Sequence, residues 1–486
     1  MRSAKPIRVA IIGGGLGGLA LANGLTRRPL EDLAEGHPGF DVHIFEVKPA
    51  LSERGASVGL APHAQKALAY CVGDAKGLLQ RAEACSSLGS NFMIGSGRNA
   101  GDRISFGPPK SMADLKPQDE KQREAIESSV SVVRTSLIHG LANALDEADS
   151  SATLHTNMKL VSITTTAKDS QVDLTFEDGQ VERFDAVIGA DGYRSVVRGF
   201  VLGDKAADEA PSATGIWDCR NLVPIETARE LFFKPVRQNM QSTDSQDGGL
   251  EQLDSVVIND SFNSWAWSGN RGFLLMGPCA NRTQVHFILA SIEKEPWKDR
   301  KRLLTREEVE QYMEGWMDGP VIGPMLDTLF HNREHLHAYS IWHQKKTSTY
   351  NNGRLCIIGD AAHATSPAQG SGAAMAFEDA MLLSHLLWRT SSASHLDYAF
   401  EAFTETRKDR CQHIIDSSED MAQLVCGLKV EAGNMNPDTG FFDFEAGKYA
   451  QAMKGRWDRI WMLDHEEHRR EARTRLEGKI AASKAE

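Results

Sequence analysis

The chain has 486 residues, of which 41% are apolar and 25% charged, and its formal net charge is −12 at pH 7. This composition is that of an ordinary soluble enzyme and excludes a collagenous or disordered chain. The acidic balance argues against nucleic acid as a partner, because binding to phosphates needs a basic surface. At this length a single hydrophobic core stops growing, so two or more domains are expected.

The seven cysteines are scattered and form no C-x-x-C pair. This pattern is typical of reduced thiols in the cytoplasm, and not of a disulfide framework or a zinc site. No apolar run reaches the ~20 residues that a membrane span needs. The N-terminus imitates a signal peptide, but its glycines between Gly13 and Gly18 suit a helical targeting segment poorly. We therefore expect a cytoplasmic protein without a membrane span.

The chain opens with a predicted strand–helix–strand unit. Residues 7–12 form a short β-branched run typical of a buried parallel strand. This run leads directly into the sequence Gly13-x-Gly15-x-x-Gly18, and an Ala- and Leu-rich helix is expected from there to about Arg27. A second strand is expected over residues 41–46 and ends at Glu46.

This unit has the chemistry of a dinucleotide site. Glycines at these positions allow a tight turn and close approach of the backbone to a pyrophosphate, to which the helix offers its N-terminal N–H groups. A carboxylate at the end of the next strand, here Glu46, accepts hydrogen bonds from ribose hydroxyls. The separation from Gly18 to Glu46 exceeds the usual ~20 residues, and the loop at residues 30–40 accounts for the difference. The motif does not distinguish NAD from FAD.

The rest of the chain mixes strands and helices in its first part and becomes helical toward its end. We expect a surface excursion at residues 108–127, a flexible loop at 238–251 and helices from residue 371 onward. Further helices are expected at 64–71 and 135–146. Strands are expected at 131–134, 160–167, 172–177, 184–189 and 355–358, with four or more within 213–292.

Two further motifs, at Asp191 and at Gly359, each follow a predicted strand. In the first, a strand ends in Asp191-Gly192, and a helix start bearing serine and arginine follows. In the second, the strand at residues 355–358 ends in Gly359-Asp360, and a glycine-rich helix start at Gly370 and Gly372 follows.

The three motifs, in this order and spacing, resemble those of the FAD-dependent aromatic hydroxylases, the single-component flavoprotein monooxygenases. The resemblance covers roughly residues 5–400. Within the family, the chain is most similar to fungal salicylate-hydroxylase-like enzymes, including those of secondary metabolism.

The resemblance implies a set of cofactor contacts. Gly13, Gly15 and Gly18 would hold the FAD pyrophosphate, and Glu46 the adenosine ribose. The remaining contacts would be made by Arg134 as an FAD-contacting arginine, Asp191 toward both FAD and NAD(P)H, and Asp360 toward the ribityl chain. A single strand–helix–strand unit holds only the AMP end of FAD, which agrees with a second carboxylate at a distant strand. The helix that opens at Gly370 and Gly372 can direct its positive end toward the flavin pyrimidine.

The fold class implied is α/β, with a Rossmann-like FAD-binding domain, an inserted β-sheet substrate domain and a helical C-terminal region. The FAD-binding domain would be discontinuous, over residues 1–80, 131–210 and 338–400. The substrate domain would comprise residues 81–130 and 211–337, and the C-terminal region residues 401–486.

The activity implied is hydroxylation of a phenolic or carboxylated aromatic substrate with NAD(P)H and O2, through a flavin C4a-hydroperoxide. No second glycine fingerprint stands between a strand and a helix, so we expect no separate Rossmann domain for NAD(P)H. Two alternatives stay open. One is an FAD enzyme of secondary metabolism that performs epoxidation, Baeyer–Villiger oxidation or halogenation. The other is a catalytically silent FAD-binding interaction protein. The oligomeric state is expected to be a monomer or a homodimer.

Arg220 is the best candidate for a catalytic residue, because it is a guanidinium in an otherwise apolar, alternating strand of the expected substrate sheet. The alternative is an edge-strand arginine that faces water. Arg271 is a second candidate, although Asn270-Arg-Gly272 has the composition of a turn. Many salicylate hydroxylases carry a histidine where this chain has Ala368, which puts salicylate itself in doubt as the substrate.

For the other groups of aromatic and histidine residues we expect no functional role. Trp265 and Trp267 are expected to pack within a sheet. His331, His335 and His337 lack a carboxylate at zinc-ligand spacing, so no metal site is expected. His63 replaces an asparagine common in the family, with no consequence that the sequence reveals.

Overall fold

The computed structural model describes residues 5–27, 36–52, 57–86, 90–105, 129–147, 151–166, 171–241, 264–344 and 346–484. The surface excursion expected at residues 108–127 lies outside this part of the chain. The loop expected at 238–251 begins inside helix α8 (Lys234–Gln241), and its remainder also lies outside the described residues.

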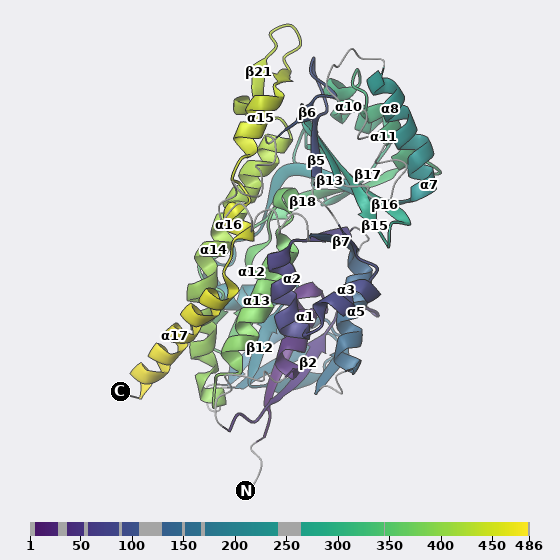
Figure 1. Ribbon diagram of the computed structural model, residues 1–486. Coiled ribbons are helices and arrows are strands. Elements are labelled where there is room, and N and C mark those ends of the chain that lie inside the picture. The colour runs from purple at the N-terminus through teal and green to yellow at the C-terminus, as the bar shows by residue number, and fades with distance from the viewer. Residues whose placement is uncertain are drawn as a thin grey trace, which may run out of the picture.

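A six-stranded sheet forms the lower body of the molecule in Figure 1. Its central strand is β1 (Ile7–Ile12), which pairs in parallel with β2 (Phe40–Phe45) on one side and β12 (Ala186–Gly189) on the other. The sheet continues through β8 (Ala152–His155) beside β2, and through β20 (Leu355–Ile357) and β19 (Asn351–Asn352) beside β12. All pairs are parallel except β19–β20. The predicted strands that carry the three motifs are therefore neighbours in one sheet.

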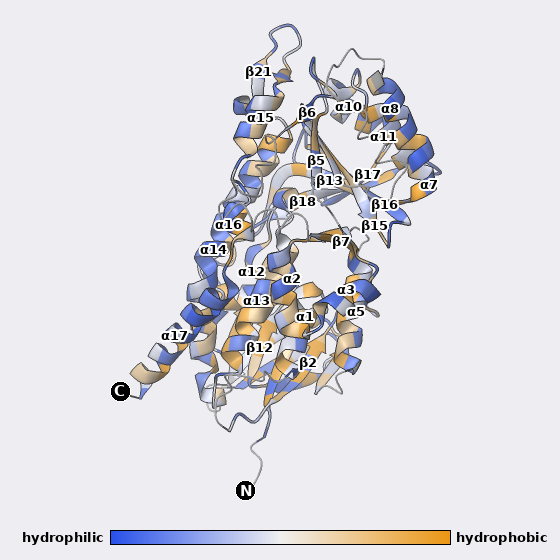
Figure 2. Cartoon of the chain, in the orientation of Figure 1, coloured by the Kyte–Doolittle hydropathy of each residue, from blue (hydrophilic) through white to orange (hydrophobic). Residues whose placement is uncertain are grey.

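Helices that are apolar on most sides cover this sheet. Helix α13 (Gly372–Leu387) is buried from Ala374 to Leu387, and it packs against α1 (Leu16–Thr26) and α2 (Pro62–Val72). The orange colouring of this layer in Figure 2 reflects its apolar composition. A helix that is hydrophobic all round is stable only when it is enclosed. Helix α5 (Arg134–Glu147) packs against the other side of α1 and against α3 (Ala75–Arg81).

An eight-stranded sheet forms the upper body in Figure 1. One of its faces buries Trp217, Trp265 and Trp267 in a core that includes side chains of helices α7, α8, α10 and α11. The prediction that the two tryptophans of residues 265–267 pack within a sheet is therefore confirmed. The strands, in spatial order, are β17 (Lys301–Leu304), β18 (Leu336–His343), β13 (Ser212–Pro224), β16 (Gln284–Ile292), β15 (Gly272–Cys279), β14 (Ser264–Gly269), β5 (Ser90–Ile94) and β6 (Arg103–Ile104). The three covering helices not yet bounded are α7 (Ile225–Ala228), α10 (Arg306–Tyr312) and α11 (Ile322–Leu329).

Two small sheets complete the lower body. Strands β9 (Leu160–Thr166), β10 (Gln171–Phe176) and β11 (Val181–Phe184) form an antiparallel meander. The strand expected over 184–189 is therefore wrong as one element, because Phe184 ends this meander while β12 begins at Ala186 in the parallel sheet. Strands β3 (Ser57–Leu60), β7 (Val130–Val133) and β4 (Cys85–Ser86) form the second small sheet.

The C-terminal region runs along one side of both bodies. Helix α14 (Leu396–Val425) spans them, and α17 (His465–Ser483) packs back against it toward the lower end (Figure 1). Between them lie β21 (Gly433–Met435), β22 (Phe442–Phe444), α15 (Ala446–Met453) and α16 (Asp458–Trp461). The helical character expected from residue 371 onward is confirmed.

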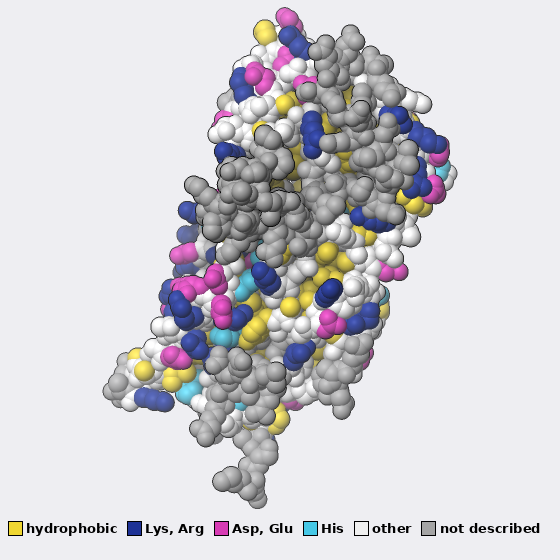
Figure 3. All heavy atoms as spheres, in the orientation of Figure 1, with side chains coloured by type: hydrophobic (Ala, Val, Ile, Leu, Met, Phe, Trp, Pro, Cys, Tyr) yellow, Lys and Arg dark blue, Asp and Glu magenta, His cyan; other side chains and the backbone are white. Residues whose placement is uncertain are grey.

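The domain boundaries stay a prediction, with one difference at a strand. The expected division between residues 337 and 338 falls inside β18, all of which belongs to the eight-stranded sheet. Within the described residues, no helix combines the length and the apolar character that crossing a membrane requires. On the face shown in Figure 3, basic side chains of the described residues are interspersed with acidic ones.

Candidate active site

The first glycine-rich turn joins β1 to α1 and has no space for side chains. Gly13 has φ +112°, and a Cβ there would lie 2.3 Å from the carbonyl oxygen of Ala190. A Cβ at Gly18 would lie 2.1 Å from the carbonyl oxygen of Gly13. Gly15 caps the N-terminus of α1 in an extended conformation. The turn therefore presses against the end of β12 and leaves the N-terminal N–H groups of α1 uncovered by side chains of their own segment.

Glu46, directly after β2, is joined to this turn. Its Oε2 accepts a hydrogen bond from the backbone N–H of Gly14 at 2.9 Å, and its Oε1 accepts one from Lys48 N–H at 3.0 Å. The carboxylate is half-buried at the carboxyl edge of the parallel sheet. Ligands of open α/β sheets bind at this edge, so Glu46 lies where the predicted ribose contact requires it.

Asp191 uses its carboxylate for a local structure. Its Oδ1 accepts a hydrogen bond from Ser195 Oγ at 2.5 Å, and its Oδ2 accepts from the N–H of Val196 at 2.7 Å. These contacts hold the start of α6 (Val196–Leu202). Burial raises the pKa of Asp191 above its usual value, although the hydrogen bond from Ser195 opposes the shift. Any contact of Asp191 with FAD or NAD(P)H stays a prediction and would be additional to this capping role.

Asp360 behaves differently. It is exposed and is the first residue of the short helix α12 (Asp360–His363), yet no side-chain hydrogen bond caps that helix. The preceding Gly359 has φ +58°, and its N–H donates to Oδ2 of Asp379 on α13 at 2.8 Å. The turn is therefore fixed from beneath while the carboxylate of Asp360 points outward. Because the exposed carboxylate caps no helix, this geometry leaves Asp360 available to a ligand.

The second glycine-rich segment leaves open space at the start of α13. Gly370 has φ +65°, and a Cβ at either Gly370 or Gly372 would meet no atom within 4 Å. A left-handed backbone conformation favours glycine at position 370. At position 372 no neighbouring atom requires glycine, and the absence of a side chain leaves free space beside the helix N-terminus.

Three charged side chains from separate elements meet near this edge. Burial lowers the pKa of Arg134, the charge of Asp360 raises it, and the charge of Arg220 lowers it. Arg134 opens α5 directly after β7, Asp360 opens α12, and Arg220 lies on β13. Arg134, which follows β7 of the small sheet, therefore lies within electrostatic range both of Asp360 at the edge of the parallel sheet and of Arg220 on the eight-stranded sheet.

Arg220 has a partner that the sequence interpretation overlooked. Its Nε and Nη2 donate to Oδ2 of Asp218, at 2.9 Å and 2.6 Å. Asp218 lies two residues away and hence on the same face of the strand. The description of this strand as otherwise apolar was wrong. The guanidinium is 32% exposed whereas the Asp218 side chain is 7% exposed, so Arg220 is the outer member of the pair. Arg271 is exposed in the β14–β15 turn with φ +53°.

Two further residues of this site were missed. His286 on β16 is 7% exposed, and its Nδ1 makes a hydrogen bond with Oγ of Ser57 on β3. Burial lowers the pKa of His286 to about 4, and the charge of Arg220 contributes in the same direction. The sequence could have indicated His286, because it is a histidine in an apolar, alternating strand. Its contact with Ser57 could not be predicted, because Ser57 is remote in sequence.

A buried ionic network lies behind the site. Arg407 on α14 donates to Oε2 of Glu378 at 2.7 Å and to Oδ1 of Asp379 at 2.8 Å, and all three side chains are fully buried. Arg410 adds a second guanidinium on Glu378 at 2.8 Å. Nε2 of His363 lies 2.5 Å from Oδ2 of Asp379. The network is charge-compensated, which is the condition for burying such groups.

His363, Asp379 and Cys411 place three potential metal ligands within 4.8 Å of one another. The carboxylate of Asp379 is already bonded to His363 and to Arg407, whose positive charge lies 2.8 Å away. A cation at this position would be repelled by Arg407. We therefore interpret the group as part of the ionic network, and the absence of a metal site stays a prediction.

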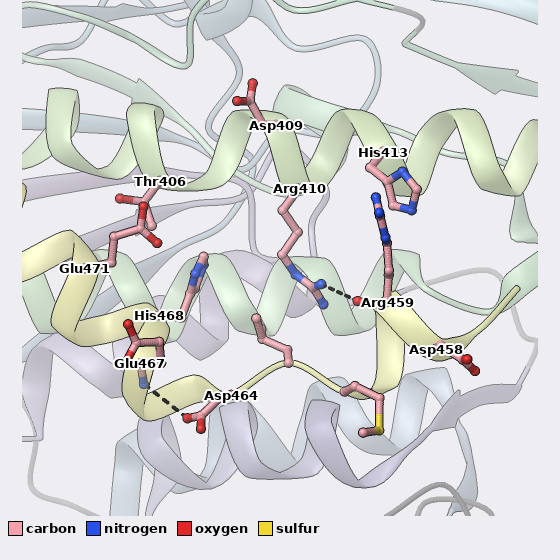
Figure 4. Close-up of a pocket in the computed structure, with 12 residues that line it drawn as sticks. Thr406, Asp409, Arg410, His413, Asp458, Arg459, Asp464, Glu467, His468 and Glu471 are labelled. Atoms are coloured by element: carbon pink, nitrogen blue, oxygen red, sulfur yellow. Dashed lines mark hydrogen bonds between the residues drawn. The ribbon is translucent and has the colours of Figure 1, made fainter. Parts of the chain in front are cut away.

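A cavity of about 620 Å³ lies elsewhere, between α14 and the segment that contains α16 and α17 (Figure 4). Arg410 crosses it to reach the backbone oxygen of Arg459 at 2.7 Å. The cavity contains none of the predicted cofactor residues, so it is not the candidate active site. Its lining residues are Thr406, Asp409, Arg410, His413, Asp458, Arg459, Met462, Leu463, Asp464, Glu467, His468 and Glu471.

The candidate site has the features that an FAD molecule needs. The closely packed turn at Gly13 and Gly18 leaves a helix N-terminus for a pyrophosphate, and Glu46, the predicted ribose contact, lies beside that turn. Asp360 is exposed after β20, and the start of α13 at Gly372 has open space beside it. The site therefore fits an elongated dinucleotide with an acidic residue available at each sugar-like segment.

Known proteins match this chain over nearly its whole length. Residues 235–418 match the family described as FAD binding domain. The 6-methylsalicylate 1-monooxygenase of Aspergillus terreus is 28% identical, over 97% of this chain and 93% of that relative. The salicylate hydroxylase of Pseudomonas putida is 27% identical, over 97% of this chain and 95% of that relative.

The solved structures show the same fold. A salicylate hydroxylase in a substrate complex aligns with TM-score 0.68 at 21% identity, over 96% of this chain and 98% of that chain. The chain therefore carries a segment that matches an FAD-binding domain, shares its fold with a salicylate hydroxylase, and is similar over nearly its whole length to FAD-dependent aromatic monooxygenases.

Proposed function

We propose that this monooxygenase hydroxylates a phenolic or carboxylated aromatic ring that binds on the Arg220 face of the eight-stranded sheet. The observation that carries the proposal is the Arg220 guanidinium, which Asp218 holds within electrostatic range of Arg134, a predicted FAD contact. Half-buried apolar side chains of the same face surround it, namely Leu222, Phe273, Leu275 and Ile288. A flat apolar ring with one acidic substituent suits this surface.

The residues of the chain would divide the work as follows. Bound FAD, reduced by NAD(P)H, supplies the activated oxygen. Arg220 would hold the acidic group of the substrate and, when that group is a phenol, would lower its pKa and enrich the ring in electrons. The apolar wall would exclude water from the reacting ring. Gly13, Gly15, Gly18, Glu46, Arg134, Asp360, Gly370 and Gly372 would hold FAD, with Asp191 beside them.

The cellular setting belongs to the same proposal. All seven cysteines are buried and free, which supports a reducing compartment such as the cytoplasm. We expect a monomer or a homodimer with NADH or NADPH as the reductant. Size-exclusion chromatography with light scattering, and a comparison of the two nicotinamides as reductants, test these points.

The test of the function is a screen of phenols and anilines for stimulated NAD(P)H oxidation, with O2 uptake and product mass measured together. A product heavier by one oxygen atom, with the aromatic ring retained, supports hydroxylation. Product structure separates this reaction from epoxidation, Baeyer–Villiger oxidation and halogenation. If no aromatic compound stimulates NAD(P)H oxidation although FAD is bound, the result favours the alternative of a catalytically silent FAD-binding interaction protein.

Arg220→Gln tests the anchor. The variant should keep its FAD, lose about 10²-fold in product turnover and oxidise more NAD(P)H without product. Arg220→Lys should recover part of the activity, because lysine keeps the positive charge but cannot bind an anion through two parallel N–H groups. Arg271→Gln, in an exposed turn, is the matched control. Parental product rates in Arg220→Gln would remove Arg220 from the reaction.

A further inference from the structure

His286 lies beside Arg220 on the proposed substrate face. In the β13–β16 pair, Arg220 is opposite Ile288 and Leu222 is opposite His286. Side chains alternate between faces along a strand, so Arg220 and His286 share one face as diagonal neighbours. Such positions are about 7–8 Å apart, within reach of a common ligand for long side chains. The effect of the Arg220 charge on the pKa of His286 agrees with this closeness.

One edge of the imidazole is held by another sheet. Nδ1 of His286 makes a hydrogen bond with Oγ of Ser57. Ser57 pairs with Val133, the residue that precedes Arg134. The ring thus connects the substrate sheet to the segment that carries a predicted FAD contact. A ring fixed through Nδ1 leaves Nε2 to bond elsewhere.

The strand on the other side of His286 offers no side chain. Gly277 on β15 lies directly opposite His286, and a Cβ there would be 2.5 Å from Oγ of Ser264 on β14, and 3.0 Å from Cε1 and 3.2 Å from Nε2 of His286. Any larger residue at position 277 would press on the imidazole. Glycine at this position therefore accommodates both the imidazole and the Ser264 side chain, and residue 277 itself does not cover the Nε2 edge.

The charge state decides what this histidine does. Burial and the charge of Arg220 hold the pKa of His286 near 4, so the ring is neutral at pH 7. A neutral ring that accepts at Nδ1 from the Ser57 hydroxyl carries its proton on Nε2 and is a donor there. As a base it would have to become charged beside Arg220, which is unfavourable. The charge of Arg220 thus opposes a role as proton acceptor, and in the tautomer in which Ser57 donates to Nδ1 the ring is a hydrogen-bond donor at Nε2.

We propose that His286 donates a hydrogen bond from Nε2 to the phenolic oxygen of the substrate, while Arg220 binds its acidic group. This inference rests on the proposed function and narrows the substrate class to rings that carry both a hydroxyl and an acidic group. No proton is transferred in this contact. Ser57 is a positioning residue, because it orients the imidazole.

The experiment measures binding to the FAD-loaded enzyme by changes in flavin absorbance, without turnover. The two probes are 6-methylsalicylate and 2-methylbenzoate, which differ only in the hydroxyl. The parental enzyme should bind 6-methylsalicylate more tightly. In His286→Phe that preference should fall roughly tenfold or more, because a donor to the oxygen is lost, while the Kd for 2-methylbenzoate stays within about twofold.

Companion variants separate this role from a structural one. Arg220→Gln should weaken both probes, and His286→Asn should restore part of the preference because its amide is a donor. Ser57→Ala should reduce the preference less than His286→Phe does. His331→Gln, at an exposed histidine, is the control and should change neither Kd. If His286→Phe does not retain FAD, the preference for 6-methylsalicylate is measured in His286→Asn and Ser57→Ala instead.

The outcomes are distinguishable. If His286→Phe and His286→Asn keep the parental preference, or lose affinity for both probes equally, the inference is overturned while the proposed function stands. If the parental enzyme binds neither probe, the proposed substrate class is wrong and the inference falls with it.

Discussion

Asp218 accepts both hydrogen bonds of Arg220 on a single oxygen, Oδ2, from Nε at 2.9 Å and from Nη2 at 2.6 Å. Among the hydrogen bonds of the described residues, none involves Nη1 of Arg220. The buried carboxylate thus fixes one edge of the guanidinium and leaves the other edge available to an anion. A mobile arginine would have to lose side-chain freedom when substrate binds.

Asp218→Asn should therefore raise KM for the aromatic substrate roughly tenfold or more, because an amide oxygen holds the guanidinium less firmly than a carboxylate. FAD content should not change, since Asp218 lies on the substrate sheet. Steady-state kinetics with the best compound of the screen measure this effect. Asp173→Asn, which disrupts an exposed ion pair with Arg183, is the control. An unchanged KM would show that Asp218 only compensates a buried charge.

Glu46→Ala should weaken FAD binding by about 1.5–3 kcal/mol, because a charged acceptor is lost. The structure adds a second reason, since Glu46 also accepts from Gly14 and so holds the turn itself. Glu46→Gln should lose less, because it keeps an acceptor for that N–H. The FAD dissociation constant is measured by fluorescence titration of the apoprotein. Glu177→Ala, at an exposed ion pair with Lys159, should leave the constant unchanged. A parental constant in Glu46→Ala would contradict the ribose assignment.

The local motifs predicted the elements that carry the expected FAD contacts, while the contacts themselves stay a prediction. β1, the glycine-rich turn, α1 and β2 follow one another along the chain, so their chemistry can be recognised within one segment. Asp360 follows the same logic, because the carboxyl ends of parallel strands meet at one edge of a sheet. Helix α13 was recognisable because its glycine-rich start precedes a long apolar run.

For the expected substrate part, the sequence indicated Arg220 but none of the side chains around it. Its neighbour Asp218 is two residues away and could have been recognised from the period of a strand. The pairing of His286 with Ser57 joins positions 229 residues apart in sequence. Arg407 likewise meets Asp379 across two helices. Such contacts depend on how the elements dock, and local propensity carries no information about docking.

Asp360→Ala should yield protein with little bound FAD. The exposed carboxylate follows β20 at the edge of the parallel sheet and makes no capping hydrogen bond to its own helix. Its loss should therefore cost binding and not folding. FAD stoichiometry after purification and the melting temperature of the apoprotein separate the two effects. Asp204→Ala, an exposed aspartate in the first turn of another short helix, is the control. A variant with full, tightly bound FAD would remove Asp360 from the cofactor site.

The pair of His363 and Asp379 should make stability depend on pH. Burial by itself lowers the pKa of His363, but the charge and hydrogen bond of Asp379 outweigh it and hold that pKa well above its usual range. Burial raises the pKa of Asp379, but His363 and Arg407 outweigh it and hold the net value below its usual range. The His363 contribution is thus complete below its unfolded pKa of about 6.5 and declines as pH rises. The Asp379 contribution is complete above about pH 4 and is lost as pH falls.

His363→Gln should abolish the alkaline part of this dependence. In the parental protein, one extra bound proton in the folded state lowers the free energy of unfolding by about 1.4 kcal/mol per pH unit above pH 6.5. Glutamine does not titrate, so the stability difference between parent and variant should shrink by about 2 kcal/mol between pH 6.5 and 8. Urea unfolding with saturating FAD at several pH values measures this difference, and His331→Gln should give a curve parallel to the parent. A parallel curve for His363→Gln as well would mean that His363 is neutral in the folded protein and that Arg407 alone balances Asp379.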